Sequence, residues 1–227
     1  MYVSVSHFPH PCLANSDGLL AIGGDLDVDS LVLAYHFGIF PWYSEGQQIL
    51  WWSPNPRLVL EPSFLKVSKS MRSILNKRPF RVTADHAFDT VIHHCKSRER
   101  KGQAGTWITD DMEVAYKKLH LAGVAHSIEV WQEEKLVGGL YGVALGKIFF
   151  GESMFTLIPN ASKYGFVKLV GLLESRRFNL IDCQQDTPHM RSFGAALISR
   201  DEFIFKLKQN QLLAEDRGSW YGLSWDS

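Results

Sequence analysis

The sequence lacks the features that mark several large classes of protein. Its 227 residues include only three cysteines, Cys12, Cys95 and Cys183, which are widely separated and form no Cys-x-x-Cys pair. We therefore expect no disulfide framework and no cysteine zinc site, and a reducing cytoplasm is the expected location. The nine histidines show no metal-ligand spacing, and no uncharged run is long enough to cross a bilayer. We expect neither a bound metal nor a membrane span.

Motifs for nucleotide binding and for a serine nucleophile are also absent. There is no P-loop, no G-x-G-x-x-G opening a helix, no H-E-x-x-H and no G-x-S-x-G. Gly138, Gly139 and Gly142 lie inside a predicted strand, where close packing or ligand approach is favoured over nucleotide binding. We expect no cofactor.

Charge is balanced over the whole chain but not along it. Basic and acidic residues number 24 each, yet ten Lys or Arg and only three Asp or Glu lie between Pro62 and Lys101. Such a block is typical of a protein with a polyanionic partner. The alternative is the solvated face of a lysine-rich helix.

The periodicity predicts a mixed α/β fold with helices packed on a sheet. A small N-terminal domain is expected over residues 1–62 and a larger domain over residues 63–227. Helices are predicted behind Asp27 up to Gly38, over Ser68–Arg78 and Ala87–Ser97, from Thr109 to Gly123, from Asn160, and over Asp201–Gln209. Strands are predicted at Arg57–Leu60, Phe80–Thr83, His126–Trp131, Leu136–Ala144, Lys147–Gly151 and Asn179–Cys183. The aromatic segments near Phe40 and Leu50–Trp52 are expected to be loop or edge strand.

Charged side chains follow two predicted strands in apolar surroundings. Glu152 comes directly after the strand that ends at Gly151, and Asp182 lies at the end of the last strand, before Gln184. Buried charges are costly unless they are paired or used, so these residues are candidates for a site. The alternative is structural: Asp182 caps the turn at residues 187–189, and Glu152 pairs with a lysine such as Lys163.

Several aromatic residues lie outside the predicted core. Trp42, Trp51, Trp52 and Trp107 fall in loop-like segments. Such residues line a groove for an extended ligand or for bases, or they hold two domains together. We interpret the Trp51–Trp52 pair as packing between the domains.

Together these segments resemble one family, the bacterial leucyl/phenylalanyl-tRNA–protein transferases. The resemblance covers about Phe8 to Phe203 and is specific because the motifs occur in order. They are Gly18–Leu26 (GLLAIGGDL), Gly38–Trp42 (GIFPW), Leu50–Arg57 (LWWSPNPR), Gly105–Ile108 (GTWI), Ala125–Trp131 (AHSIEVW), Gly151–Phe155 (GESMF) and Ile181–Gln184 (IDCQ).

The resemblance implies a small N-terminal domain followed by a domain similar to the acetyl-CoA-dependent (GNAT-like) acetyltransferases. It implies transfer of leucine or phenylalanine, and also methionine, from charged tRNA to the N-terminal amine of proteins that begin with Arg or Lys. The products are thereby marked for degradation. This sequence lacks the acetyltransferases' pyrophosphate loop, which argues against acetyl-CoA binding, and the resemblance implies charged tRNA as the donor in place of acyl-CoA. We expect a monomer.

The resemblance also implies roles for individual residues. Asp182 and Gln184 match the reacting centre, where Asp182 orients or deprotonates the amine and Gln184 holds it or relays a proton. The apolar pocket for the donor side chain corresponds to Leu140, Phe149, Met154, Leu169 and Ile181. The residues matched to the acceptor peptide or the terminal adenosine are Glu152, Tyr35, Trp42, Trp107 and Tyr116. The residues matched to the tRNA-binding region are Lys69, Arg72, Lys77 and Arg78.

This sequence departs from the family pattern in two places. Ser73 and Asn76 occupy positions expected to be basic, and the segment 97–105, with Arg100 and Lys101, is longer than usual. Two rival functions stay open: an RNA-binding module without chemistry, and a small-molecule acyltransferase that uses acyl-CoA. Asp182 and the apolar pocket argue against the first, and the missing pyrophosphate loop argues against the second.

Overall fold

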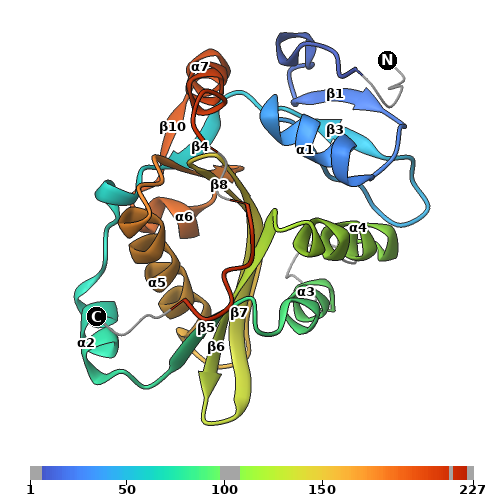
Figure 1. Ribbon diagram of the computed structural model, residues 1–227. Helices are drawn as coiled ribbons and strands as arrows, with labels where there is room; N and C mark the ends of the chain where they lie inside the picture. The colour runs from blue at the N-terminus through green and yellow to red at the C-terminus, as the bar shows by residue number, and fades with distance from the viewer. Residues whose placement is uncertain (1–6, 98–107, 215–216, 224–227) are drawn as a thin grey trace.

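The described residues form two β-sheets with associated helices (Figure 1), in a computed structural model that describes residues 7–97, 108–214 and 217–223. The smaller sheet has the spatial order β1 (Leu19–Ile22), β3 (Leu50–Trp52), β2 (Phe40–Pro41), and helix α1 (Val28–His36) accompanies it. β3 is the middle strand, so the expectation of a loop or edge strand there is wrong. The reason is Trp51, which is buried and whose indole N–H donates to the Gly23 carbonyl at 2.8 Å.

The larger sheet has seven strands and contains the antiparallel meander that the sequence predicts. Its spatial order is β10 (Ala196–Ile198), β4 (Arg57–Leu60), β9 (Leu180–Gln184), β8 (Ile148–Thr156), β7 (Lys135–Leu145), β6 (Ala125–Gln132), β5 (Arg81–Ala84). All neighbours pair antiparallel except β8 and β9, which are parallel and are connected through helix α5 (Ala161–Ser175). The mixed α/β prediction is confirmed.

Helices cover both faces of the larger sheet. Figure 1 shows α3 (Phe88–Lys96) and α4 (Asp110–Leu121) on one face, α5 on the other, and α2 (Lys69–Lys77) on the outer side of α5. β7 shows how one strand supplies two cores, because successive side chains point to opposite faces. Tyr141 and Val143 belong to the core that contains α3 and α4, whereas Leu140 and Ala144 belong to the core under α5.

Helix boundaries follow their capping residues. The Ser68 hydroxyl accepts the Met71 N–H at the start of α2, and the Thr109 hydroxyl accepts the Met112 N–H at the start of α4. The sequence analysis did not predict the short elements β1, α6 (Pro188–Ser192) and β10; α7 (Arg200–Asn210) agrees with its prediction. Within the described residues no helix combines the length and apolar character needed to span a membrane.

Two strands extend further than predicted, and this changes the setting of the polar residues. β8 continues past Gly151 to Thr156 because this stretch keeps pairing with β7, as at Leu140 and Met154. Glu152 therefore lies within a strand and not after one. Asp182 likewise lies inside β9, and only Gln184 is at a strand end.

The link between the two sheets precedes the expected boundary at residue 62. β4 ends at Leu60 and yet pairs with β9 and β10 in the larger sheet. One continuous core contains Trp51 of the smaller sheet together with Tyr116 of α4 and Phe150 of β8. Trp51 belongs to this shared core, while its interpretation as packing between the domains and the division at residue 62 stay predictions.

The glycines of β7 allow close packing. A Cβ atom at Gly138 would lie 2.8 Å from the Cβ of Ala161, and one at Gly142 would lie 2.5 Å from Cζ of Phe149. The first glycine admits α5 to the sheet, and the second makes room for an aromatic ring. The packing interpretation is therefore confirmed for both.

Candidate active site

A cavity of about 560 Å³ opens beside strands β8 and β9, with α5 and α6 contributing to its wall. All five residues expected for the apolar pocket line it: Leu140, Phe149, Met154, Leu169 and Ile181. The sequence did not single out Phe166 and Met190, which also line it and belong to the same core. The lining also contains Glu152, Asp182, Gln184 and Trp42. The cavity thus combines the polar residues Glu152, Asp182 and Gln184 with an apolar surface.

Glu152 is hydrogen-bonded to three side chains around this cavity. Its Oε1 accepts the Tyr35 hydroxyl at 2.7 Å and the Gln184 Nε2 at 2.8 Å, and its Oε2 lies 3.0 Å from the Tyr116 hydroxyl. The two tyrosine oxygens are themselves 2.5 Å apart. The alternative that Glu152 pairs with Lys163 is wrong, because its oxygens are occupied by these partners.

These contacts form a triangle of oxygen atoms from Tyr35, Tyr116 and Glu152. The number of protons available for its three hydrogen bonds indicates the protonation state of Glu152. Three oxygen–oxygen contacts need three protons, and the two hydroxyls supply only two. All three bonds are made when Glu152 carries the third proton and donates to Tyr116, which donates to Tyr35, which donates back to Glu152. The geometry therefore favours a protonated carboxyl.

The pKa of Glu152 agrees with this arrangement. Burial raises it to about 7, and the nearby negative charge of Asp182 acts in the same direction, while the hydrogen bonds from Tyr35, Tyr116 and Gln184 oppose the rise. Burial likewise raises the pKa of both tyrosines well above the usual value, with the charge of Glu152 contributing. Near neutral pH the triangle is therefore a set of neutral hydroxyls around a carboxyl that can gain or lose a proton.

Tyr35 and Tyr116 are not where the sequence analysis expected them. Both are fully buried, and neither lines the cavity. They lie behind Glu152, Tyr35 on α1 and Tyr116 on α4, because each belongs to the core shared by the two sheets. Their contact with the cavity is indirect, through the Glu152 carboxylate.

Asp182 is fully buried and is held by an arginine that the sequence analysis missed. Arg57 Nε donates to Oδ1 at 2.8 Å, and its Nη2 donates to Oδ2 at 2.6 Å. The guanidinium lies between the rings of Phe40 and Phe203, at 4.8 and 4.7 Å from their centroids. A charged residue at the start of the short apolar strand β4 was the available signal, because such a residue needs a buried partner.

Asp182 also fixes the next polar residue. Its Oδ1 accepts the Gln184 N–H at 2.9 Å, and Gln184 has a left-handed backbone with φ of 60°. The alternative that Asp182 caps the turn at residues 187–189 is wrong, since the Thr187 side chain caps α6 itself through the Met190 N–H. Because Oε1 of Glu152 accepts whether or not Oε2 carries the proton, the Gln184 amide nitrogen faces Glu152 and its amide oxygen is left for another donor.

The aromatic candidates divide into two groups. Trp42 is half-buried, lines the cavity and has its ring 5.6 Å from that of Trp52. Trp107 lies outside the described residues, as do Arg100 and Lys101. Of the aromatic residues expected at the cavity, Trp42 is the one that the structure describes there.

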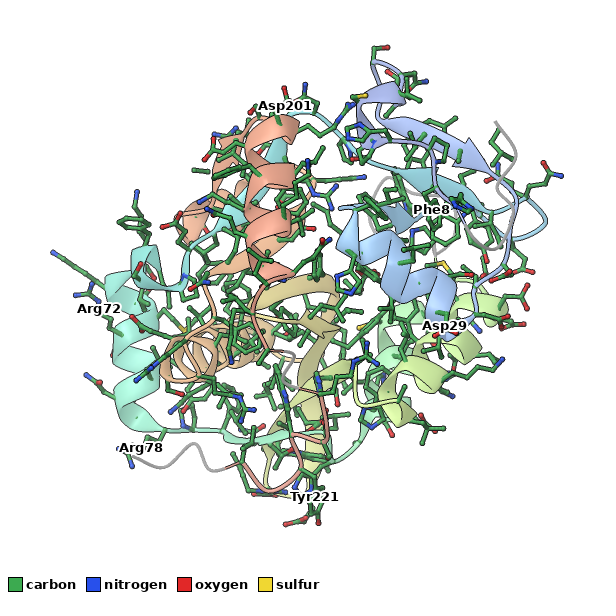
Figure 2. All side chains as sticks on the ribbon, turned by 45° about the horizontal axis from the view of Figure 1, so that its top comes forward. Phe8, Asp29, Arg72, Arg78, Asp201 and Tyr221 are labelled. Atoms are coloured by element: carbon green, nitrogen blue, oxygen red, sulfur yellow. The ribbon has the colours of Figure 1, made fainter. Side chains whose placement is uncertain are left out.

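The four basic residues expected to contact tRNA lie on one exposed helix. Lys69, Arg72 and Lys77 belong to α2, and Arg78 caps its end; all four are exposed, as Figure 2 shows for Arg72 and Arg78. Ser73 and Asn76 are exposed on the same helix. α2 buries only Met71 and contacts α5, which contributes residues to the cavity. A positive surface thus lies next to a wall of the cavity.

Two family models match this chain. The model for leucyl/phenylalanyl-tRNA protein transferase matches residues 59–208, and the model for its N-terminal domain matches residues 24–55. The chain belongs to this family. It is accordingly an aminoacyltransferase that acts between tRNA and protein. In the described part of this family member, no group of three or more His, Cys, Asp or Glu residues is arranged to hold a metal.

Individual relatives are similar over nearly the whole chain. The leucyl/phenylalanyl-tRNA–protein transferase of Anaeromyxobacter sp. (strain K) is 52% identical over 213 residues, covering 94% of this chain and 91% of the relative. That of Syntrophobacter fumaroxidans is 53% identical over 217 residues, covering 96% and 93%. Among solved structures, L-PGS from Bacillus licheniformis is 12% identical with a TM-score of 0.40, covering 72% of this chain and 51% of the other.

The buried pair between Arg57 and Asp182 predicts a large loss of stability when the arginine is replaced. Arg57→Met leaves Asp182 charged and unpaired, so the free energy of unfolding should fall by about 3–5 kcal/mol in urea titrations. The matched control is Arg191→Met, which removes a bidentate pair with Asp186 that is about half exposed. Removing this exposed pair should change the free energy of unfolding little. Equal losses in the two variants would contradict the assigned importance of burial.

The raised pKa of Glu152 predicts a pH-dependent effect of Glu152→Gln. Ionisation of Glu152 opposes folding, so the wild-type protein loses stability as pH rises from the ordinary value of 4.5 through about 7. Glutamine does not ionise, and the variant should gain roughly 3 kcal/mol relative to wild type across that window. Urea unfolding at pH 5 and pH 8.5 measures this difference.

Glu113→Gln is the control of opposite sign. The Glu113 pKa is lowered overall because hydrogen bonds and charges from Lys117 and Lys96 outweigh its burial. This variant should lose stability relative to wild type once the pH exceeds the unfolded-state pKa. A Glu152→Gln difference that does not grow with pH would show that the carboxyl ionises normally.

Proposed function

We propose that this protein transfers leucine or phenylalanine, and also methionine, from charged tRNA to the N-terminal amine of a protein that begins with Arg or Lys. The new N-terminal residue would mark that protein for degradation. The observation that carries the proposal is one cavity whose apolar lining meets the Glu152–Gln184 pair. An RNA-binding module without chemistry has no use for such a buried polar pair beside an apolar pocket.

The apolar part of the cavity is the proposed site of the donor side chain. Leu140, Phe149, Met154, Leu169 and Ile181 come from strands β7, β8 and β9 and from α5, and a branched or aromatic side chain would bury its carbon atoms among them. A charged side chain would lose its hydration there without gaining a partner. The reactive ester would then lie at the polar edge of the pocket.

The amide oxygen of Gln184 is the proposed holder of the acceptor amine. In the reaction the amine nitrogen attacks the ester carbonyl carbon, an amide bond forms, and the bond to the ribose oxygen breaks. The proton that the nitrogen loses ends on that ribose oxygen, so no cofactor or oxidant is required. Transfer from an ester to an amine is downhill, and the protein contributes mainly by positioning the two reactants.

Asp182 is better suited to orienting than to accepting a proton. It is fully buried, and both of its oxygens receive hydrogen bonds from Arg57. Its remaining bond holds the backbone of Gln184. Of the two roles open to Asp182, we therefore propose that it orients the amine and does not deprotonate it, and that it does so by positioning Gln184.

Charge at the cavity supports a cationic acceptor. The described lining includes two carboxylates, Glu152 and Asp182, and no lysine or arginine. Asp182 is neutralised by Arg57, so Glu152 is the charge available to an N-terminal Arg or Lys. A cation close to Glu152 would favour its ionised form and strengthen the attraction.

The exposed basic residues on α2 and at its end are the proposed contact with the tRNA backbone. Lys69, Arg72, Lys77 and Arg78 provide four positive charges next to α5. Phosphate contacts of this kind supply affinity that falls with salt. Because the donor is charged tRNA, we place the activity in the cytoplasm and propose that a monomer carries it out.

The direct test is incubation with phenylalanine-labelled tRNA and a peptide that begins with arginine. Label should move to the peptide N-terminus, and the same peptide beginning with glutamate should receive little because Glu152 repels it. The transfer is measured by mass spectrometry of the peptide. Release of the label only as free phenylalanine would count against the proposal.

The division between chemistry and tRNA binding can be tested with two variants. Gln184→Met keeps side-chain length but removes the amide, so turnover should fall on the order of 100-fold while tRNA affinity stays unchanged. Lys69→Ala with Arg72→Ala should weaken affinity and reduce the slope of log affinity against log salt by about 1.5–2.

The control for the second variant is Lys118→Ala with Lys208→Ala, which removes two exposed lysines from α4 and α7. It should leave tRNA affinity and its salt dependence nearly unchanged. Equal weakening by both double variants would mean that α2 has no special part in binding tRNA.

A further inference from the structure

The segment 217–223, here called the C-terminal strap, runs against the larger sheet and inserts one tryptophan into the core. Trp220 is 1% exposed and belongs to the same core cluster as Leu140, Phe149 and Ile181 of the cavity. The strap therefore reaches the residues that shape the apolar pocket, although it does not line the cavity itself.

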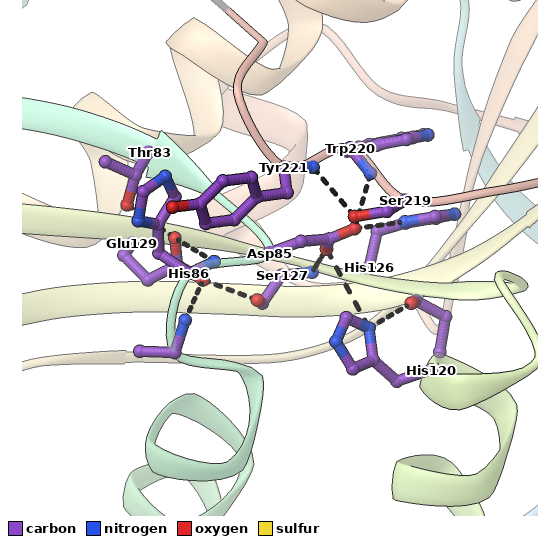
Figure 3. Close-up of polar contacts among 12 residues, drawn as sticks. Thr83, Asp85, His86, His120, His126, Ser127, Glu129, Ser219, Trp220 and Tyr221 are labelled. Atoms are coloured by element: carbon purple, nitrogen blue, oxygen red, sulfur yellow. Dashed lines mark hydrogen bonds and ion pairs between the residues drawn. The ribbon is translucent and has the colours of Figure 1, made fainter.

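Hydrogen bonds and ring stacking hold the C-terminal strap against the rest of the protein (Figure 3). The Trp220 N–H donates to Asp85 Oδ2 at 2.7 Å, and the indole stacks on His126 with ring centroids 4.0 Å apart. The Gly218 N–H donates to the Gly123 carbonyl at 3.1 Å. Tyr221, outside the core, stacks on His86 at 4.2 Å. These contacts together fix the position of Trp220 in the core.

Asp85 is itself fixed by the strand beside it. Its Oδ1 accepts the Ser127 N–H at 3.0 Å, and its Oδ2 lies 3.0 Å from His126 Nδ1 in addition to the strap. The hydrogen bonds from His126, Trp220 and Ser127, together with the His126 charge, keep the Asp85 pKa below its usual value despite burial. The attachment point of the strap is thus a buried carboxylate that is hydrogen-bonded to Ser127, His126 and Trp220 and lies 3.9 Å from His120 Nδ1.

The indole ring is placed by its faces and not by its N–H, with the Arg176 guanidinium 5.8 Å from the ring centroid. Its Nε1 is buried and has no hydrogen-bond partner among the described residues. A buried indole usually finds a partner, and leaving it without one is costly. Packing against neighbouring rings is therefore what places Trp220, and Phe149 is one of those rings, at a centroid distance of 6.1 Å.

Phe149 is held from two sides. On one side its ring rests against Gly142, where a Cβ atom would come within 2.5 Å of Cζ. On another side lies Trp220. Phe149 in turn lines the cavity. Trp220, which does not line the cavity, thus occupies buried space next to the Phe149 ring.

We propose that Trp220 sets the depth of the donor pocket by holding Phe149, and so acts as a positioning residue for selection among amino acids on tRNA. This inference rests on the proposed function, in which the apolar cavity receives the donor side chain. A smaller residue at position 220 would let the Phe149 ring retreat and would lengthen the pocket. The kcat/KM for larger donor side chains would then rise relative to that for leucine.

The experiment compares one tRNA charged chemically with leucine, phenylalanine or tryptophan, so that tRNA binding is constant. The variant Trp220→Leu should raise the ratio of kcat/KM for tryptophan over leucine by about tenfold, the scale of discrimination by an apolar pocket. Trp220→Phe keeps an aromatic ring against His126 and should give a smaller rise. A ratio of rates does not depend on the fraction of folded enzyme.

The matched control is Tyr221→Leu, which removes the stacking on His86 at an exposed position of the same strap. It should leave the ratio at the wild-type value. Ratios within twofold of wild type for both Trp220 variants, together with lowered unfolding midpoints, would overturn the inference and leave Trp220 a purely structural residue. Failure of the wild-type protein to transfer any of the three amino acids would instead count against the proposed function.

Discussion

The ion pair between Arg57 and Asp182 connects the parts of the molecule that form the site. Arg57 begins β4, Asp182 lies in the neighbouring β9, and the guanidinium is enclosed by Phe40 of the smaller sheet and Phe203 of α7. Removing two charges from water is unfavourable unless their geometry is good and their other hydrogen bonds are made. The bidentate pair meets the first condition, and the bond from Asp182 to the Gln184 backbone helps meet the second. The pair thereby fixes the backbone N–H of Gln184, from which the side-chain amide extends.

Glu152 shows the complementary situation, a buried carboxyl that has no cationic partner among the residues that the structure describes. Tyrosine hydroxyls surround it, and its pKa lies close to the pH of a neutral solution. Asp182 and Glu152 thus differ because of their neighbours: Asp182 is paired with Arg57, whereas Glu152 lies among neutral hydroxyls and an amide. Gln184 touches both, since its backbone bonds to Asp182 and its side chain to Glu152.

The sequence predicted local features well and long-range pairs poorly, and the reason is physical. The helix beginning at Thr109 and the strand Arg57–Leu60 follow from capping and from apolar patterning over a few residues. The apolar lining of the cavity was found through family resemblance, because periodicity alone does not separate a pocket wall from a core. The partnership of Arg57 with Asp182 spans 125 positions, and only the tertiary fold brings the two together. For the same reason Tyr35 and Tyr116 were expected in the cleft, although both lie beneath it.

The shared core and the triangle of oxygens have a consequence for how this enzyme can be recombined. Tyr35 comes from α1, whereas Tyr116 and Glu152 come from α4 and β8 of the larger part. Consider a chimera that joins the N-terminal part of one relative to the larger part of another. It must keep the oxygen atoms of Tyr35, Tyr116 and Glu152 within hydrogen-bond distance of one another. The two parts therefore form a matched set in this chain, and a chimera that takes α1, α4 and β8 from one parent keeps the three contacts together.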